Sequence, residues 1–157
     1  NCKCSCSGNE GEAKLNTKRL ASEFEDLRYA TEQSAAAPKV FMLTIGNLTM
    51  RLARAQFSSN FFACAGYEII DNLGFNTVAE GVKAAREKKA DIIVLCSSDP
   101  EYAELIPQAI KEIDGKEELV LAGPDTEEFR NLGITTFVNV KSNVLNTLKA
   151  FNAKLLK

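Results

Sequence analysis

Apolar and polar positions alternate along the chain with two different periods. From about Thr17 an apolar residue recurs every three or four positions, at Leu20, Phe24 and Leu27, which is typical of an amphipathic helix. Five short apolar runs then follow, each separated from the next by a segment with helical period. These runs predict strands at residues 39–46, 67–71, 91–98, 117–123 and 134–140.

The segments between the predicted strands carry the start and stop signals of helices. One helix is expected from about Thr49 to Ala65, and the next follows a cap at Thr77. Tyr102, Leu105, Ile106, Ala109, Ile110 and Ile113 form the apolar stripe of a third helix. Pro107 falls within that stripe and predicts a kink or a place near the first turns. A short helix is expected at residues 125–133, and Ser142 is expected to cap the last helix.

Strands that alternate with helices indicate an α/β fold with a doubly wound, five-stranded parallel sheet. The expected strand order is 2-1-3-4-5, as in flavodoxins. Such folds bind ligands at the carboxyl ends of the strands, beside the point where the strand order reverses. In this chain those ends read "GNLT", "CSSD", "AGPD" and "VKS".

The pattern divides the chain into three parts. Residues 1–15 are polar and unpatterned, so we expect a disordered tail. Residues 16–38 are expected to form a helix and a linker, and residues 39–157 the α/β domain.

The five cysteines fall into two groups. Cys2, Cys4 and Cys6 form "CKCSC", which lacks the second ligand pair of most zinc sites, so no metal site is predicted there. Cys64 and Cys96 lie among apolar residues and are expected to be buried. An odd number of cysteines without disulfide-like spacing favours a reducing compartment, and we expect a cytoplasmic protein.

Composition excludes several classes of chemistry. The chain has no histidine, which excludes histidine acid–base catalysis, Ser–His and Cys–His pairs, and histidine-ligated metals. The net charge of −2 gives no basic surface for nucleic acid or an anionic membrane. No apolar run approaches the ~20 residues that a membrane-spanning helix needs.

Two known classes of protein share the predicted strand order. A phosphorylation receiver domain needs carboxylates after the first strand to hold a divalent cation. Lys141 fits the lysine after its fifth strand, but the turn Gly46-Asn47-Leu48 has no carboxylate and Asp99 follows two serines. The sequence therefore disfavours a receiver domain.

A flavodoxin-like module that binds FMN or another small ligand stays open as an alternative. Thr44 and Thr49 have a spacing compatible with a phosphate loop after the first strand. Tyr102 and Phe75 only approximate the large aromatic side chains that flank a flavin.

Several long phrases of the sequence resemble one family. They are "RLASEFEDLRYATEQ", which holds "ASEFEDLR", and further on "FSSNFFACAGYE" and "VLCSSDPEYAE". From about Lys18 to the end, the chain resembles the carboxyl-terminal, cobalamin-binding-like domain of the methylmalonyl-CoA mutase small subunit. The resemblance implies a heterodimeric enzyme that interconverts (R)-methylmalonyl-CoA and succinyl-CoA, with the large subunit as partner.

In that family the large subunit binds adenosylcobalamin through a D-x-H-x-x-G motif after the first strand. Here the turn reads "GNLTMRLAR", with Leu48 or Thr49 near the Asp position and Met50 or Arg51 near the His position. Side chains at Leu52 to Arg54 replace the glycine. The resemblance therefore implies a cofactor site that has lost its ligand, with adenosylcobalamin bound only by the partner subunit.

We accordingly expect no catalytic residue, no metal and no cofactor on this chain, and a vestigial pocket in the turns. Its expected residues are Gly46, Asn47, Leu48, Thr49, Met50, Ser97, Ser98 and Gly123. Side chains at the glycine position are expected to fill the groove. The helical spacing of Leu48, Met50 and Leu52 is equally consistent with packing in the core.

Overall fold

Five parallel strands form one sheet in the computed structural model, which describes residues 21–35 and 37–155. The strands are β1 (Lys39–Thr44), β2 (Glu68–Ile70), β3 (Ile92–Cys96), β4 (Glu118–Ala122) and β5 (Phe137–Val138). Their order is β2-β1-β3-β4-β5, which confirms the predicted topology. The order reverses at β1, whose Val40 lies opposite Ile69 of β2 and Ile92 of β3.

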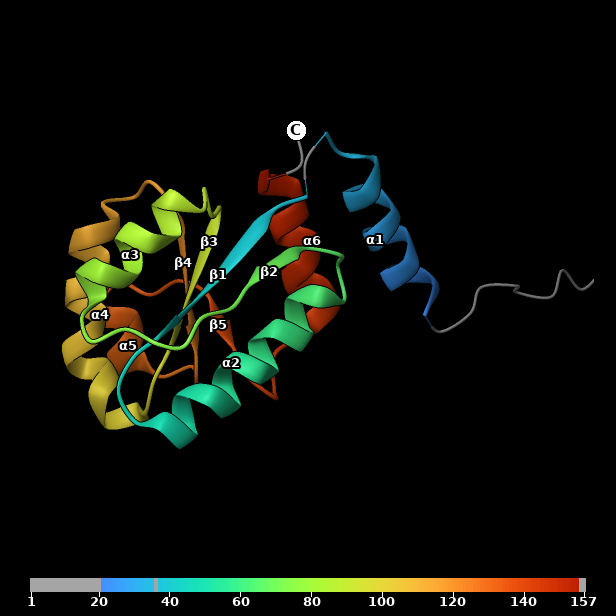
Figure 1. The fold of residues 1–157 in the computed structure, drawn as a ribbon. Coiled ribbons are helices and arrows are strands. Elements are labelled where there is room, and N and C mark those ends of the chain that lie inside the picture. The colour runs from blue at the N-terminus through green and yellow to red at the C-terminus, as the bar shows by residue number, and fades with distance from the viewer. Residues whose placement is uncertain (1–20, 36, 156–157) are drawn as a thin grey trace, which may run out of the picture.

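Helices cover both faces of this sheet. They are α1 (Ser22–Gln33), α2 (Leu48–Ala63), α3 (Val78–Glu87), α4 (Asp99–Ile113), α5 (Glu127–Asn131) and α6 (Val144–Leu155). As Figure 1 shows, α2 and α6 lie on one face, α3, α4 and α5 lie on the other, and α1 packs outside α6.

Alternate residues of the central strands supply two separate cores. Ile92, Val94 and Cys96 of β3 face α2 and α6, whereas Ile93 and Leu95 face α3 and α4. All five residues are fully buried, as expected for a parallel strand covered on both faces. The two cores place the carboxyl ends of β1, β3, β4 and β5 along one edge of the sheet, where the candidate site lies.

Two helix starts differ from the sequence prediction. Helix α2 begins at Leu48 instead of Thr49, because the Asn47 side chain accepts a hydrogen bond from the Met50 backbone N–H at 3.1 Å. At α6 the corresponding acceptor is Asn143, which bonds the Asn146 N–H, and not Ser142. The predicted cap at Thr77 is confirmed by its bond from the Glu80 N–H. Pro107 lies inside α4 and not in its first turns.

The two described cysteines differ from each other. Cys96 is buried, as predicted, and burial raises the pKa of its thiol to about 12. Cys64 is exposed at the end of α2, so the expectation that it is buried was wrong. The apolar neighbours of Cys64 in the sequence turn to the core on a different side of the helix. Thr17, Leu20 and the predicted tail with Cys2, Cys4 and Cys6 lie outside the described residues.

Helix α1 docks on α6 through the predicted stripe. Leu27 is buried with α6 residues Leu148 and Phe151, and Phe24 packs at the edge of the same cluster. The Asn152 side chain of α6 donates a hydrogen bond to the Leu27 carbonyl at 3.4 Å. The helix before the domain is therefore packed on the domain itself.

We predict that Leu27→Ala lowers the free energy of unfolding by about 2–4 kcal/mol, because it removes buried methyl groups between two helices. Chemical denaturation of the purified variant measures this change. Tyr29→Ala is the matched control on α1, since 63% of Tyr29 is exposed. Equal effects of the two substitutions would contradict the docking of α1.

Candidate functional site

The turns after β1 and β3 meet at the carboxylate of Glu101, in the first turn of α4. Its Oε2 accepts hydrogen bonds from the hydroxyls of Ser97 and Ser98, both at 2.6 Å, and from the Asn47 backbone N–H at 3.2 Å. The bonds from the two serine hydroxyls, followed by the bond from Asn47, lower the pKa of Glu101 to about 2. Glu101 is therefore an ionised cross-link and not a proton donor at neutral pH.

Gly46 lets this carboxylate lie directly against the backbone of the β1–α2 turn. Its φ is +84°, a left-handed conformation that favours glycine, and a Cβ at this position would collide with the carboxylate of Glu101. The space over the turn is therefore filled by a side chain of the protein itself.

Two arginines of α2 add further ties across the same edge. Arg51 donates to the carbonyls of Gly46 and Leu73, each at 3.3 Å. Arg54 donates to the Ser97 carbonyl at 2.7 Å and pairs with Asp99 at 2.6 Å. These bonds attach α2 to the loops after β1, β2 and β3.

The Tyr102 side chain forms the buried floor beneath Arg54. The ring is fully buried, and the Arg54 guanidinium lies 5.1 Å from its centroid. The hydroxyl donates to the Ala122 carbonyl and accepts from the Ser97 backbone N–H. Burial raises the pKa of Tyr102 to about 12, so the phenol is a neutral structural donor.

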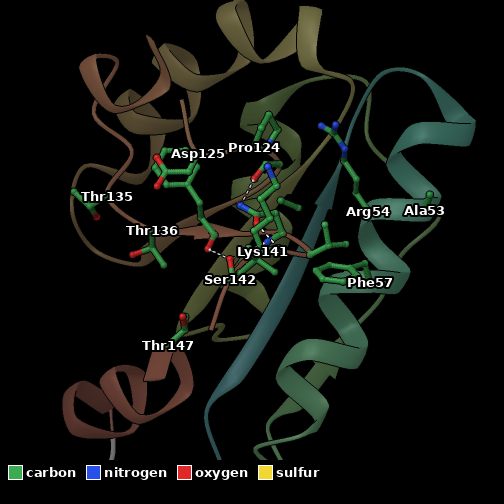
Figure 2. Close-up of a pocket in the computed structure, with 16 residues that line it drawn as sticks. Ala53, Arg54, Phe57, Pro124, Asp125, Thr135, Thr136, Lys141, Ser142 and Thr147 are labelled. Atoms are coloured by element: carbon green, nitrogen blue, oxygen red, sulfur yellow. Dashed lines mark hydrogen bonds between the residues drawn. The ribbon is translucent and has the colours of Figure 1, made fainter. Parts of the chain in front are cut away.

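An open pocket of about 870 Å³ lies beside this closed region. Figure 2 shows α2 on one side of the pocket, with Thr147 of α6 and the segments around β5 on the other. The lining includes Ala53, Arg54, Phe57, Gly123, Pro124, Asp125, residues 135–142 and Thr147.

The loop after β5 is held rigidly at the pocket by its own polar side chains. Asn139 donates to the Gly123 carbonyl at 3.1 Å and accepts from the Lys141 N–H at 2.8 Å. Ser142 donates to the Phe137 carbonyl at 3.2 Å. Lys141 is exposed at the rim.

Two of the three charged side chains that line the pocket are held in ion pairs. Asp125 forms hydrogen bonds with both Nε and Nη2 of Arg130, and these bonds lower its pKa. Arg54 is paired with Asp99. Lys141 adds a positive charge at the exposed rim of the pocket.

The predicted site residues fall into three places. Gly46, Asn47, Ser97 and Ser98 gather around Glu101. Gly123 lines the neighbouring pocket, where a Cβ would lie 3.1 Å from the Tyr102 ring. Leu48, Thr49 and Met50 lie exposed on the first turn of α2.

The alternative that Leu48, Met50 and Leu52 pack in the core was wrong. Leu48, Met50 and Leu52 are exposed by 58%, 38% and 51%. Ala53 and Arg54 line the open pocket without filling it. Glu101 and Arg51 each bond the backbone of the turn after β1.

Sequence reasoning missed Glu101 and the bonds that Arg51 and Arg54 make. The spacing Ser98-x-x-Glu101 before a helical stripe is the signature of a capping box, so a signal for Glu101 was present. Arg54 gave no such signal, because its partners Ser97 and Asp99 are distant in sequence.

The side chains considered for a flavin differ in burial. Thr44 donates to the Asn72 side chain at 2.8 Å and is buried, and Tyr102 is fully buried. Phe75 is half-buried and packs on Phe41 with ring centroids 5.7 Å apart, whereas Thr49 is exposed.

Two further features were searched within residues 21–35 and 37–155. They hold no group of three or more His, Cys, Asp or Glu side chains placed to bind a metal ion. In the same part of the chain, no helix has the length and apolar character needed to cross a membrane.

Known sequences similar to this chain are methylmalonyl-CoA mutase small subunits. The small subunit of Porphyromonas gingivalis is 62% identical over 142 residues, which cover 89% of this chain and 23% of that protein. The small subunit of Streptomyces virginiae is 34% identical over 115 residues, covering 67% of this chain and 18% of that protein. The chain thus spans about a quarter or less of the length of these curated relatives. No protein-family model matches the chain.

A solved structure shares the fold. A cobalamin-binding protein from Desulfitobacterium hafniense DCB-2 superposes with a TM-score of 0.56 at 16% identity, covering 87% of this chain and 71% of that one. At this identity the likeness concerns the fold alone. The chain is therefore a homologue of one segment of the methylmalonyl-CoA mutase small subunits, and it has the α/β fold of a cobalamin-binding protein.

Proposed function

We propose that the chain is a non-catalytic domain of a methylmalonyl-CoA mutase that supplies structure and subunit contacts. The assembled enzyme would interconvert (R)-methylmalonyl-CoA and succinyl-CoA. Its large subunit would be the partner and would carry the adenosylcobalamin. The similarity to small subunits supports the assignment to this enzyme, although it covers only one segment of them.

The observation that carries the non-catalytic role is the set of side chains in the turn after β1. Met50 and Arg51 stand where the family resemblance places the histidine that binds cobalt, and the chain has no histidine. Met50 is partly exposed on a helical turn, and the Arg51 guanidinium is bonded to two carbonyls. A thioether is a soft ligand that poorly suits cobalt(III). The residues present therefore do not fit a histidine-ligated cobalamin.

The pocket beside Arg54 favours a second candidate function, the binding of a small anionic ligand. Its volume of about 870 Å³ lies within the range of small-molecule sites, and Lys141 places a positive charge at its rim. A flavin is disfavoured as the ligand, because Tyr102 is fully buried and Phe75 packs on Phe41.

We predict that the chain does not bind adenosylcobalamin at micromolar concentration in a spectroscopic titration. Met50→His should not bind it either, because the Glu101 and Arg51 network still occupies the turn. Isothermal calorimetry of both proteins provides a second measurement. Saturable binding of one equivalent by the unsubstituted chain would contradict the non-catalytic proposal. Binding by Met50→His alone would show that only the cobalt ligand had been lost.

Association with the large subunit is the second expected outcome. Size-exclusion chromatography of the chain mixed with the large subunit of the same mutase should give co-elution at micromolar concentration. A flavodoxin of similar size serves as the control for non-specific association. Separate elution of both proteins would contradict the proposed partner.

The Glu101 cross-link should make stability depend on pH in the acidic range. A lowered folded-state pKa means that the ionised carboxylate stabilises the fold above its ordinary pKa of 4.5, and that this contribution is lost as the pH falls towards 2. Glu101→Gln should therefore destabilise the protein by about 1–3 kcal/mol at neutral pH. The difference from the unsubstituted protein should shrink between pH 4.5 and pH 2.

Denaturation at a series of pH values measures this difference. Glu104→Gln, at an exposed position of the same helix, is the matched control and should change stability little at any pH. A constant gap between Glu101→Gln and the unsubstituted protein across this pH range would show that the charge of Glu101 is not the stabilising feature.

A further inference from the structure

The open pocket beside β5 has a largely apolar lining. Ala122 and Val138 are buried there on the neighbouring strands β4 and β5. Phe57 of α2 and Phe137 of β5 are half-buried and line the same pocket. Figure 2 shows Phe57 on one side of the pocket and Thr147 of α6 on the other. A lining of this kind suits a ligand with an apolar body and disfavours a sugar or another fully polar molecule.

The charges of the lining indicate how much charge such a ligand carries. Arg54 is paired with Asp99, and Asp125 is paired with Arg130. Lys141 is exposed at the rim and forms no ion pair with any residue of the part of the chain that the structure describes. A single unpaired ammonium group suits a single negative charge and disfavours both a cation and a polyphosphate.

Two threonines add neutral polar groups to the pocket. Thr136 and Thr147 are half-buried in the lining. Neither hydroxyl forms a hydrogen bond with another residue within 21–35 and 37–155. A hydroxyl both donates and accepts, so each of them is able to bond a polar substituent of a ligand.

The pocket is also formed before any ligand arrives. The Asn139 side chain bonds the Gly123 carbonyl and the Lys141 backbone N–H, which fixes the loop after β5 over the end of β4. Ser142 is bonded to the Phe137 carbonyl in the same loop. A lining that is already fixed lowers the entropy cost of binding.

We propose that this pocket binds an organic acid with one negative charge and an apolar body, such as an aryl or branched alkyl carboxylate. The acid group lies at Lys141, the apolar body contacts Phe57 and Val138, and the threonine hydroxyls bond any further polar substituent. Such a ligand needs no metal-binding side chain, which agrees with a chain that has no histidine. This inference rests on the second candidate function proposed above, and it names the class of anion.

Calorimetry of the chain with three probes tests the proposal. 1-Naphthoate has both the charge and the apolar body, 1-naphthamide has the same rings without the charge, and acetate has the charge without the rings. We expect saturable binding of one equivalent of 1-naphthoate with a Kd below about 1 mM. Binding of 1-naphthamide should be about threefold weaker, and that of acetate at least about tenfold weaker. No binding of 1-naphthoate at millimolar concentration would overturn the proposal.

Substitution of the rim lysine tests the charge. Lys141→Gln should weaken the binding of 1-naphthoate about threefold, as expected for an exposed ion pair, and leave that of 1-naphthamide unchanged. Lys111→Gln is the matched control, because Lys111 is exposed on α4 and outside the pocket lining. Equal weakening of both probes by Lys141→Gln would contradict an acid group at Lys141.

Substitution of a wall residue tests the location. Ala53 is exposed on α2 and lines the pocket, so Ala53→Trp should fill the entrance and abolish binding of 1-naphthoate with little change in Tm. In an NMR titration of the unsubstituted chain, the amide shifts should concentrate at residues 122–123 and 137–142. Shifts confined to other residues, or unchanged binding by Ala53→Trp, would exclude this pocket as the site.

The same probes separate this inference from the functions on which it rests. Acetate that binds as tightly as 1-naphthoate would overturn the apolar body and leave the pocket as a site for small anions. Failure of both anions to bind would overturn the second candidate function together with this inference. The role in the mutase is tested independently, by co-elution with the large subunit.

Discussion

The carboxylate of Glu101 is the interaction on which the functional edge of this domain depends. A single oxygen of this side chain accepts bonds from the loops after β1 and β3, which are distant in sequence. The bonds lower its pKa to about 2, so the charge persists at all physiological pH values. The contact needs glycine at position 46, since a Cβ there would collide with the carboxylate.

This cross-link divides the sheet edge into three regions with different properties. At the turn after β1, Glu101 and Arg51 bond the backbone. The region beside Gly123 is an open pocket of about 870 Å³. Leu48 and Leu52 are exposed near the start of α2, next to the turn after β1. A fold that usually offers one ligand site at this edge here has a bonded polar turn, a cavity and exposed leucines.

These different regions of the sheet edge are consistent with a domain that has the fold of a cofactor-binding protein and a structural role. The two cores on either side of β3 are formed by strands and helices of the chain itself. In the turn after β1, Arg51 donates to the Gly46 carbonyl, and Glu101 accepts from the Asn47 backbone N–H.

The sequence by itself determined the order of strands and helices, the covered faces of β3, and the absence of a histidine ligand. Those features depend on local period and composition, which each segment carries independently of its neighbours. The tertiary structure decided which apolar stripes are buried against another element. Leu27 is buried because α6 lies beside it, whereas Leu48, Leu52 and Cys64 are exposed because no described element covers that part of α2. The role of Glu101 was likewise decided in three dimensions, since its contact with Asn47 joins residues 54 positions apart and no local pattern encodes such a distance.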